Sequence, residues 1–162
     1  MATPIQLYEQ GHLAKLDGGL DDDELPERII YACPQVVQWI DTVLPNMEPF
    51  LDESRASPMQ QLDHLLYEFI SGAELSTYKK AHAMTPLEMG IWELKTPDLR
   101  IFGWFHKNGV FIAGEISTAV ICKSNAGAYA GFRTVTAYRR TILDLDEPKF
   151  ITGGYKDVLQ TK

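Results

Sequence analysis

This sequence of 162 residues contains only two cysteines, and it has no long apolar run and no internal repeat. The two cysteines, Cys33 and Cys122, lie far apart among apolar residues, without the spacing of a zinc or redox motif. Buried, reduced thiols are therefore expected. No apolar stretch is long enough to span a membrane, because Glu115 interrupts the best candidate. No metal, no cofactor and no membrane partner is expected.

The first ten residues, MATPIQLYEQ, have neither a basic start nor an apolar centre. A signal peptide is therefore not expected, and the sequence predicts a cytoplasmic protein. With 45% hydrophobic and 23% charged residues, the composition is that of an ordinary globular protein. The length is typical of one domain with a genuine hydrophobic core.

Positive charge is scarce in the first half of the chain. Residues 1–75 contain 14 acidic side chains against three basic ones, whereas residues 76–162 contain 12 basic side chains against eight acidic ones. The corresponding net charges are −11 and +4, which suggests an anionic partner for the second half. Two solvated faces of unequal charge are the alternative. A whole-chain pI near 5.0 argues against unspecific coating of nucleic acid.

Residues 1–28 are predicted to form an acidic, flexible N-terminal extension, and residues 29–162 a single domain. The segment 17–27, DGGLDDDELPE, combines glycine, proline and carboxylates, a composition typical of weakly ordered chain. Its four consecutive carboxylates, at 21–24, do not have the spacing of a calcium loop. A solvated acidic linker or the start of a helix is expected there instead.

Three segments have the apolar periodicity of helices. The first spans residues 34–44, between two prolines, and the second spans residues 58–70. For the second, Ser57 is expected to cap the N-terminus and Gly72 to end the helix. The third predicted helix covers residues 126–143.

The segment 90–123 is expected to form a meander of about four antiparallel strands. Asn108-Gly109 separates two apolar runs and predicts a hairpin, because this pair accepts the positive φ angles of a type I′ turn. A second turn is predicted at residues 96–98 and a third bend at residues 117–118, after which residues 119–123 resume a strand. The predicted fold is α+β, with N-terminal helices packed on this sheet and a C-terminal helix.

Three stretches carry a resemblance to a known family: LYEFISGAEL at 66–75, GIWELKTPDLRIFGWF at 90–105 and ICK at 121–123. Their order resembles that of the RelE/HigB-type toxins, in the RelE/ParE superfamily of bacterial type II toxin–antitoxin systems. The resemblance covers about residues 35–140. The chain departs from the family pattern in its acidic N-terminus, in Cys122 where a second basic or aromatic residue is common, and in its tail after Leu143.

The resemblance implies a growth-inhibiting endoribonuclease that cleaves messenger RNA, commonly on the ribosome, and is neutralised by an antitoxin protein. Attack by the RNA's own 2′-hydroxyl needs a base, a proton donor for the leaving oxygen and positive charge near the phosphorane. Lysine, arginine, histidine and tyrosine supply these functions without a metal. The alternative is a non-enzymatic toxin or phage-type inhibitor of the same fold that binds a host protein such as DNA gyrase. A further alternative is that the acidic N-terminal segment lies across the basic sheet and blocks it.

Alternation along residues 99–106 places an arginine, aromatic rings and a histidine on one face of the strand. Arginine beside aromatic rings suits a phosphate next to a stacked base, although Arg100 could instead pair with a carboxylate such as Glu93. Lysines at strand ends either contact phosphate or are solvated, and a histidine before a turn is either exposed or an acid–base group. The predicted catalytic residues are Arg100, Lys123, Lys95 and His106. The predicted RNA-binding residues are Trp104, Tyr129, Arg139 and Arg140.

Overall fold

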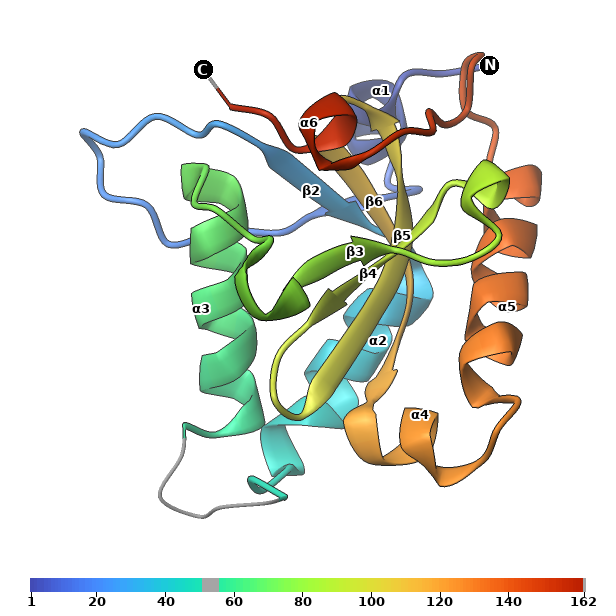
Figure 1. Cartoon of the computed structure of the whole chain (residues 1–162). Helices are drawn as coiled ribbons and strands as arrows, with labels where there is room; N and C mark the ends of the chain where they lie inside the picture. Colours follow the sequence, from blue (N-terminus) through green and yellow to red (C-terminus); the bar gives the residue numbers. More distant parts are fainter. Residues whose placement is uncertain (51–55, 162) are drawn as a thin grey trace.

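The computed structural model describes residues 1–50 and 56–161, which form a mixed β-sheet with helices on both faces (Figure 1). The six strands of this part of the chain are β1 (Ala14–Lys15), β2 (Ile29–Ala32), β3 (Ala81–Ala83), β4 (Ile91–Lys95), β5 (Leu99–Lys107) and β6 (Val110–Thr118). Their order in the sheet is β1-β2-β6-β5-β4-β3. All neighbours are antiparallel except β2 and β6, which are parallel. The α+β class is confirmed, but the expectation of about four antiparallel strands is too low.

Helices cover both faces of the sheet, and α3 and α5 lie on opposite sides of it (Figure 1). The α-helices are α1 (Pro4–Glu9), α2 (Pro34–Thr42), α3 (Pro58–Ser71), α4 (Ala119–Ser124), α5 (Ala128–Ile142) and α6 (Tyr155–Val158). The short 3₁₀ turns are η1 (Leu44–Asn46), η2 (Thr77–Lys79) and η3 (Leu87–Met89). None of the helices in the described residues is long and apolar enough to cross a membrane.

Local sequence signals explain the boundaries of α3. The Ser57 hydroxyl accepts a hydrogen bond from the backbone N–H of Gln60, and the Gln60 side chain accepts one from the backbone N–H of Ser57. Pro58 occupies the first turn, where its missing N–H costs no helical hydrogen bond. Gly72 ends the helix in the left-handed conformation, with φ of 90°. These boundaries and the helical prediction for this segment are confirmed.

The central hairpin is also confirmed. Asn108 and Gly109 connect β5 to β6. Gly109 has φ of 76°, but φ of Asn108 is not positive, so the type I′ turn predicted for this hairpin is wrong. The turn predicted at residues 96–98 connects β4 to β5. The strand predicted at residues 119–123 is wrong, because this segment is the helix α4. The Thr118 hydroxyl accepts a hydrogen bond from the backbone N–H of Ile121 and so caps a helix where the sequence pattern suggested another strand.

Residues 1–28, predicted as a separate extension, contribute α1 and β1 to the folded domain. Leu7 and Leu13 are buried, and the backbone N–H of Ala2 donates to the carbonyl of Asp144. Within the acidic stretch, Glu24 accepts a hydrogen bond from Tyr67 of α3 over 2.8 Å. This stretch therefore lies beside α3, on the opposite side of the sheet from α5 (Figure 1).

The sheet separates two hydrophobic clusters. The cluster on the side of α2 and α3 includes Ile30, Phe69, Leu94, Phe105 and Phe111. The cluster on the side of α1 and α5 includes Leu7, Phe102, Trp104, Ile112 and Phe132. The alternation predicted along β5 is present, and both of its faces are buried beneath helices. The two cysteines are buried and unbonded, as expected.

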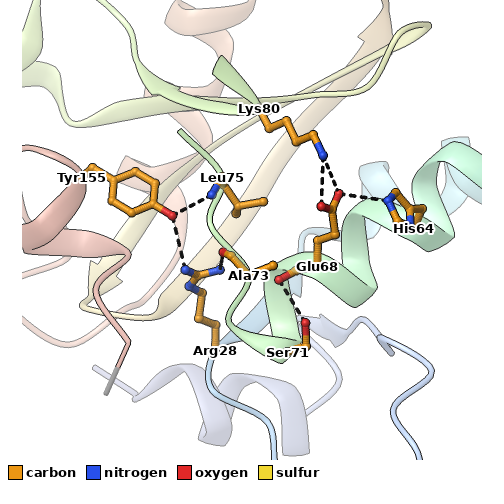
Figure 2. Close-up of polar contacts among 8 residues, drawn as sticks. All are labelled: Arg28, His64, Glu68, Ser71, Ala73, Leu75, Lys80 and Tyr155. Atoms are coloured by element: carbon orange, nitrogen blue, oxygen red, sulfur yellow. Dashed lines mark hydrogen bonds and ion pairs between the residues drawn. The ribbon is translucent and has the colours of Figure 1, made fainter. Parts of the chain in front are cut away.

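Arg28 joins three segments near the C-terminal end of α3 (Figure 2). Its guanidinium donates to the carbonyls of Phe69 and Ala73 over 3.1 and 3.0 Å, and to Leu159 over 2.9 Å. Nearby, the hydroxyl of Tyr155 accepts a hydrogen bond from the backbone N–H of Leu75. Burial lowers the pKa of Arg28. This arginine therefore ties β2 to the C-terminal ends of α3 and α6.

Candidate functional site

A cleft of about 560 Å³ lies between α5 and the outer strands β3 and β4. We call it the α5 cleft. Its charged and polar lining residues are His82, Thr85, Glu93, Lys95, Tyr129 and Arg133. Two strands, one helix and the loops beside them contribute these side chains, so the cleft depends on tertiary packing.

Glu93 is the most buried charged residue of the α5 cleft, with 3% of its surface exposed. It lies in β4, among the buried apolar residues of that strand, and faces α5 because its neighbours Trp92 and Leu94 pack on the α3 side. One carboxylate oxygen lies 3.4 Å from Nε of Arg100, and the other lies 3.5 Å from Nε2 of His82. Two cationic partners thus compensate the burial of this carboxylate.

His82 is the cross-strand neighbour of Glu93 and connects the buried carboxylate to solvent. Its Nδ1 lies 3.3 Å from the carbonyl oxygen of Ala83, while Nε2 faces Glu93. An imidazole with an oxygen acceptor at each nitrogen is suited to carry both protons. The hydrogen bond to Glu93 raises the pKa of His82, against the opposing effect of burial. With 37% of its side chain exposed, His82 can exchange a proton with a ligand in the cleft.

Arg100 and Tyr129 hold the base of the cleft in place. Nη1 of Arg100 donates to the backbone carbonyls of Thr96 and Leu99 over 2.6 and 2.9 Å. Its Nε donates to the Tyr129 hydroxyl of α5 over 3.2 Å. Only 7% of the Arg100 side chain is exposed, so its guanidinium lies behind Glu93 and away from the solvent. Arg100 therefore positions the carboxylate and ties β5 to α5.

Positive charge lines the mouth of the α5 cleft. Lys95 is half-buried at the end of β4 and forms no ion pair within residues 1–50 and 56–161. Arg133 of α5 lies across the cleft and donates to the backbone carbonyl of Thr85. Two cations beside a proton-carrying histidine can bind an anion such as phosphate.

Cys122 of α4 is electrostatically coupled to Glu93 and Arg100 but is not a nucleophile. Its side chain is 1% exposed. Burial raises the pKa of the Cys122 thiol to about 11; Glu93 raises it further and Arg100 lowers it. A thiol with this pKa is protonated at neutral pH, whereas nucleophilic attack needs the thiolate.

The structure brings together three of the eight residues that the sequence singled out. Lys95 and Tyr129 line the α5 cleft, and Arg100 contacts Tyr129 beneath it. The pairing of Arg100 with Glu93, considered from the sequence as an alternative to phosphate binding, is present. Lys123 is exposed in the last turn of α4 and does not end a strand.

The other four residues lie in different surroundings. Trp104 is 0% exposed, so a base has no access to its ring in this conformation. Nε2 of His106 lies 3.0 Å from Asp146, and Arg139 bonds to Glu115 over 3.0 Å. Arg140 donates to the carbonyl of Met89, and its guanidinium lies 3.5 Å from the centre of the Phe150 ring. Burial lowers the pKa of Arg140 to about 10.

Sequence reasoning missed His82 and Arg133 as site residues and considered Glu93 only as a partner for Arg100. A signal for Glu93 exists, because a glutamate inside an apolar strand is rarely buried without a function or a partner. His82 gives no comparable signal, since its strand has three residues and it meets Glu93 only through the pairing of β3 with β4.

Comparisons with protein-family models, with curated proteins and with solved structures found no match to this chain. The geometry of the α5 cleft and the chemistry of its residues are therefore the basis for assigning a function.

Proposed function

We propose that this protein is an endoribonuclease that cleaves messenger RNA in the α5 cleft without requiring a metal. The supporting observation is the pair of His82 and the buried Glu93, which faces a cleft lined by Lys95 and Arg133. A histidine with a raised pKa donates a proton near neutral pH, and the two cations attract the RNA phosphate. The resemblance of residues 90–105 to the RelE/HigB-type toxins supports the same reaction.

In this proposal, the 2′-hydroxyl oxygen attacks the adjacent phosphorus atom and its proton passes to solvent. The bond between phosphorus and the 5′-oxygen breaks, His82 protonates that oxygen, and a 2′,3′-cyclic phosphate remains. Lys95 and Arg133 stabilise the charge that develops on the phosphorane. Glu93 holds the imidazolium in position, and Arg100 positions Glu93.

The first experiment is cleavage of a purified messenger RNA fragment, with the products mapped for 2′,3′-cyclic ends. We expect His82→Asn to lower the cleavage rate by about 100-fold, because the proton donor is lost. His12→Asn, at an exposed histidine between α1 and β1, is the matched control and keeps the wild-type rate. Wild-type protein that produces no cyclic ends, on free RNA or on ribosomes, would overturn the proposal.

The proposed biological setting is a cytoplasmic toxin that acts on ribosome-bound messenger RNA and is neutralised by an antitoxin protein. Inducible expression in a bacterium tests this part of the proposal. Wild-type protein is expected to stop growth and to create new messenger ends, whereas Lys95→Ala is expected to do neither. Growth that continues under wild-type expression would contradict a toxin function.

The second candidate function is inhibition of a host protein, such as DNA gyrase, by binding. Exposed apolar side chains on the outer surface of α4 and α5 favour it: Val120, Ile121, Val135 and Ile142. This function predicts growth arrest without new messenger ends. It also predicts that Val135→Asp relieves the arrest, whereas Lys95→Ala does not.

A further inference from the structure

The largest of the described cavities lies on the other side of the outer strands, against α3. This cleft of about 780 Å³, which we call the α3 cleft, is within the size range of small-ligand sites. Its walls include Leu65 of α3 and Pro97 of the turn between β4 and β5. Gln61, also in the wall, is fully engaged, because it bonds to Thr96 and to both the backbone and the carboxylate of Asp98. These hydrogen bonds hold this wall of the α3 cleft in place.

Tyr78 lines the α3 cleft, and its backbone has a strained conformation. Tyr78 has φ of 58° and ψ of 19°, and the next residue, Lys79, has φ of 52°. Two successive residues with side chains in the left-handed region are unusual, and such strain concentrates at functional sites. Tyr78 is nevertheless 87% exposed, so core packing does not explain its position. The strained turn presents a free aromatic face to a ligand.

One wall of the α3 cleft carries a carboxylate between two donors (Figure 2). Nζ of Lys80 lies 3.0 Å from each oxygen of Glu68, and Nε2 of His64 lies 3.3 Å from one of them. A carboxylate has about four acceptor positions, and these contacts use three of them, so Glu68 can accept one further hydrogen bond from a ligand. The Watson–Crick edge of guanine offers two adjacent N–H donors and a carbonyl acceptor, which match a carboxylate flanked by a lysine.

Lys95 lines both the α3 cleft and the α5 cleft. It is the last residue of β4, so both clefts meet the end of this strand. A phosphate on Lys95 would therefore have one neighbouring nucleotide in the α5 cleft and the other in the α3 cleft.

We infer that the α3 cleft binds a guanine base of single-stranded RNA, next to the phosphate bound by Lys95. The ring of Tyr78 stacks on the base, Glu68 accepts a hydrogen bond from its N1–H group, and Lys80 donates to its O6. This inference rests on the proposed ribonuclease function and adds a base preference to it.

Binding of 5′-GMP and 5′-CMP to the intact protein, measured by calorimetry, tests the inference separately from cleavage. We expect GMP to bind about tenfold more tightly than CMP, and Tyr78→Ala to weaken GMP binding by about tenfold. Tyr78→Phe, which keeps the aromatic face, should restore binding, and Tyr8→Ala, at an exposed tyrosine of α1, should leave it unchanged. Glu68→Gln should remove the preference for GMP over CMP, since the amide nitrogen cannot accept a hydrogen bond.

The outcomes separate the two proposals. GMP binding that depends on Tyr78, in a protein that cuts no RNA, would support the base site and overturn the ribonuclease function. RNA cleavage that depends on His82, together with equal binding of GMP and CMP or with full binding by Tyr78→Ala, would overturn the base site alone.

Discussion

Two histidine–glutamate pairs lie on opposite faces of the sheet and differ mainly in their burial. The nearest nitrogen–oxygen distance is 3.3 Å for His64 and Glu68 and 3.5 Å for His82 and Glu93. The exposed fractions of the side chains are 70% and 17% for the first pair and 37% and 3% for the second. Two charges at one distance interact far more strongly where water is excluded. The two pairs therefore differ in burial and not in distance. His64 and Glu68 form a surface pair, whereas His82 and the buried Glu93 form the candidate reaction centre.

The origin of the two pairs also differs. His64 and Glu68 are four residues apart in α3, so helix geometry alone brings them together. His82 and Glu93 come from β3 and β4 and meet through strand pairing. Arg100 from β5 and Tyr129 from α5 complete the second cluster. The buried pair can exist only after the sheet has formed and α5 has packed on it.

The largest expected difference between the pairs is in stability. Glu93→Ala leaves Arg100 buried without its carboxylate, so we expect the free energy of unfolding to fall by about 3 kcal/mol. Glu68→Ala, at the more exposed pair, should lower it by less than about 1 kcal/mol. Urea unfolding of both variants measures the two values. Equal losses would contradict the conclusion that burial distinguishes the pairs.

A smaller effect is expected from removing one tyrosine hydroxyl on each side of the sheet. Tyr129→Phe deletes the acceptor of the Arg100 hydrogen bond in the half-buried cluster and should cost about 1 kcal/mol. The control, Tyr67→Phe, deletes an exposed hydrogen bond to Glu24 and should cost less than about 0.5 kcal/mol. Chemical denaturation of the two variants gives both costs, and a larger loss for Tyr67→Phe would reverse the comparison.

The buried pair should also make stability depend on pH. Because the folded-state pKa of His82 is raised above its ordinary value of 6.5, protonation favours the folded protein. The stability difference between wild type and His82→Gln should be fully present below about pH 6 and should fall as the pH rises through the raised pKa. Urea midpoints at several pH values between about 5 and 9 measure this difference. A difference that grows with pH would show that His82 is not held by Glu93.

The smallest expected effect concerns salt and the exposed pair. Raising NaCl from about 0.05 M to about 1 M shortens the screening length and should reduce the cost of His64→Ala by less than about 0.5 kcal/mol. The cost of Glu93→Ala should change little over the same range, since water and ions do not reach the buried carboxylate. A strong salt dependence for Glu93→Ala would mean that ions in the α5 cleft reach the Glu93 carboxylate.

Local signals predicted much of the fold because they act over a few residues. The cap at Ser57, the left-handed Gly72 and the Asn108-Gly109 turn each determine an element boundary by their own conformational preferences. The same reasoning failed at residues 119–123, where an apolar run fits a strand or a helix and the cap at Thr118 decided for the helix. Short apolar runs are ambiguous for this reason.

Long-range pairing could not be predicted from the same signals. β1 and β3 contain two and three residues, too few to have a recognisable period, and β2 pairs in parallel with β6 across half of the chain. The contribution of residues 1–28 to the sheet and core was missed, because their acidic composition resembles that of a weakly ordered segment. Such segments become ordered when neighbouring elements bury their few apolar residues.

In the candidate site, too, the sequence predicted some features, and only the packing of the chain decided the others. Lys95, Arg100 and Tyr129 were selected from the sequence for their chemical types, and the structure places them around the α5 cleft. The sequence did not show that Arg100 faces inward or that Trp104 is fully buried, because alternation assigns a face to a side chain but not what covers that face.

The sequence by itself determined the α+β class, the start of α2, both boundaries of α3, the central hairpin and the two buried thiols, since these follow from short-range preferences and hydrophobicity. Only the tertiary structure decided that His82 would meet Glu93 and that Lys95 would border two clefts. The physical reason is that burial of a charge depends on every element packed around it. No short stretch of sequence carries that information.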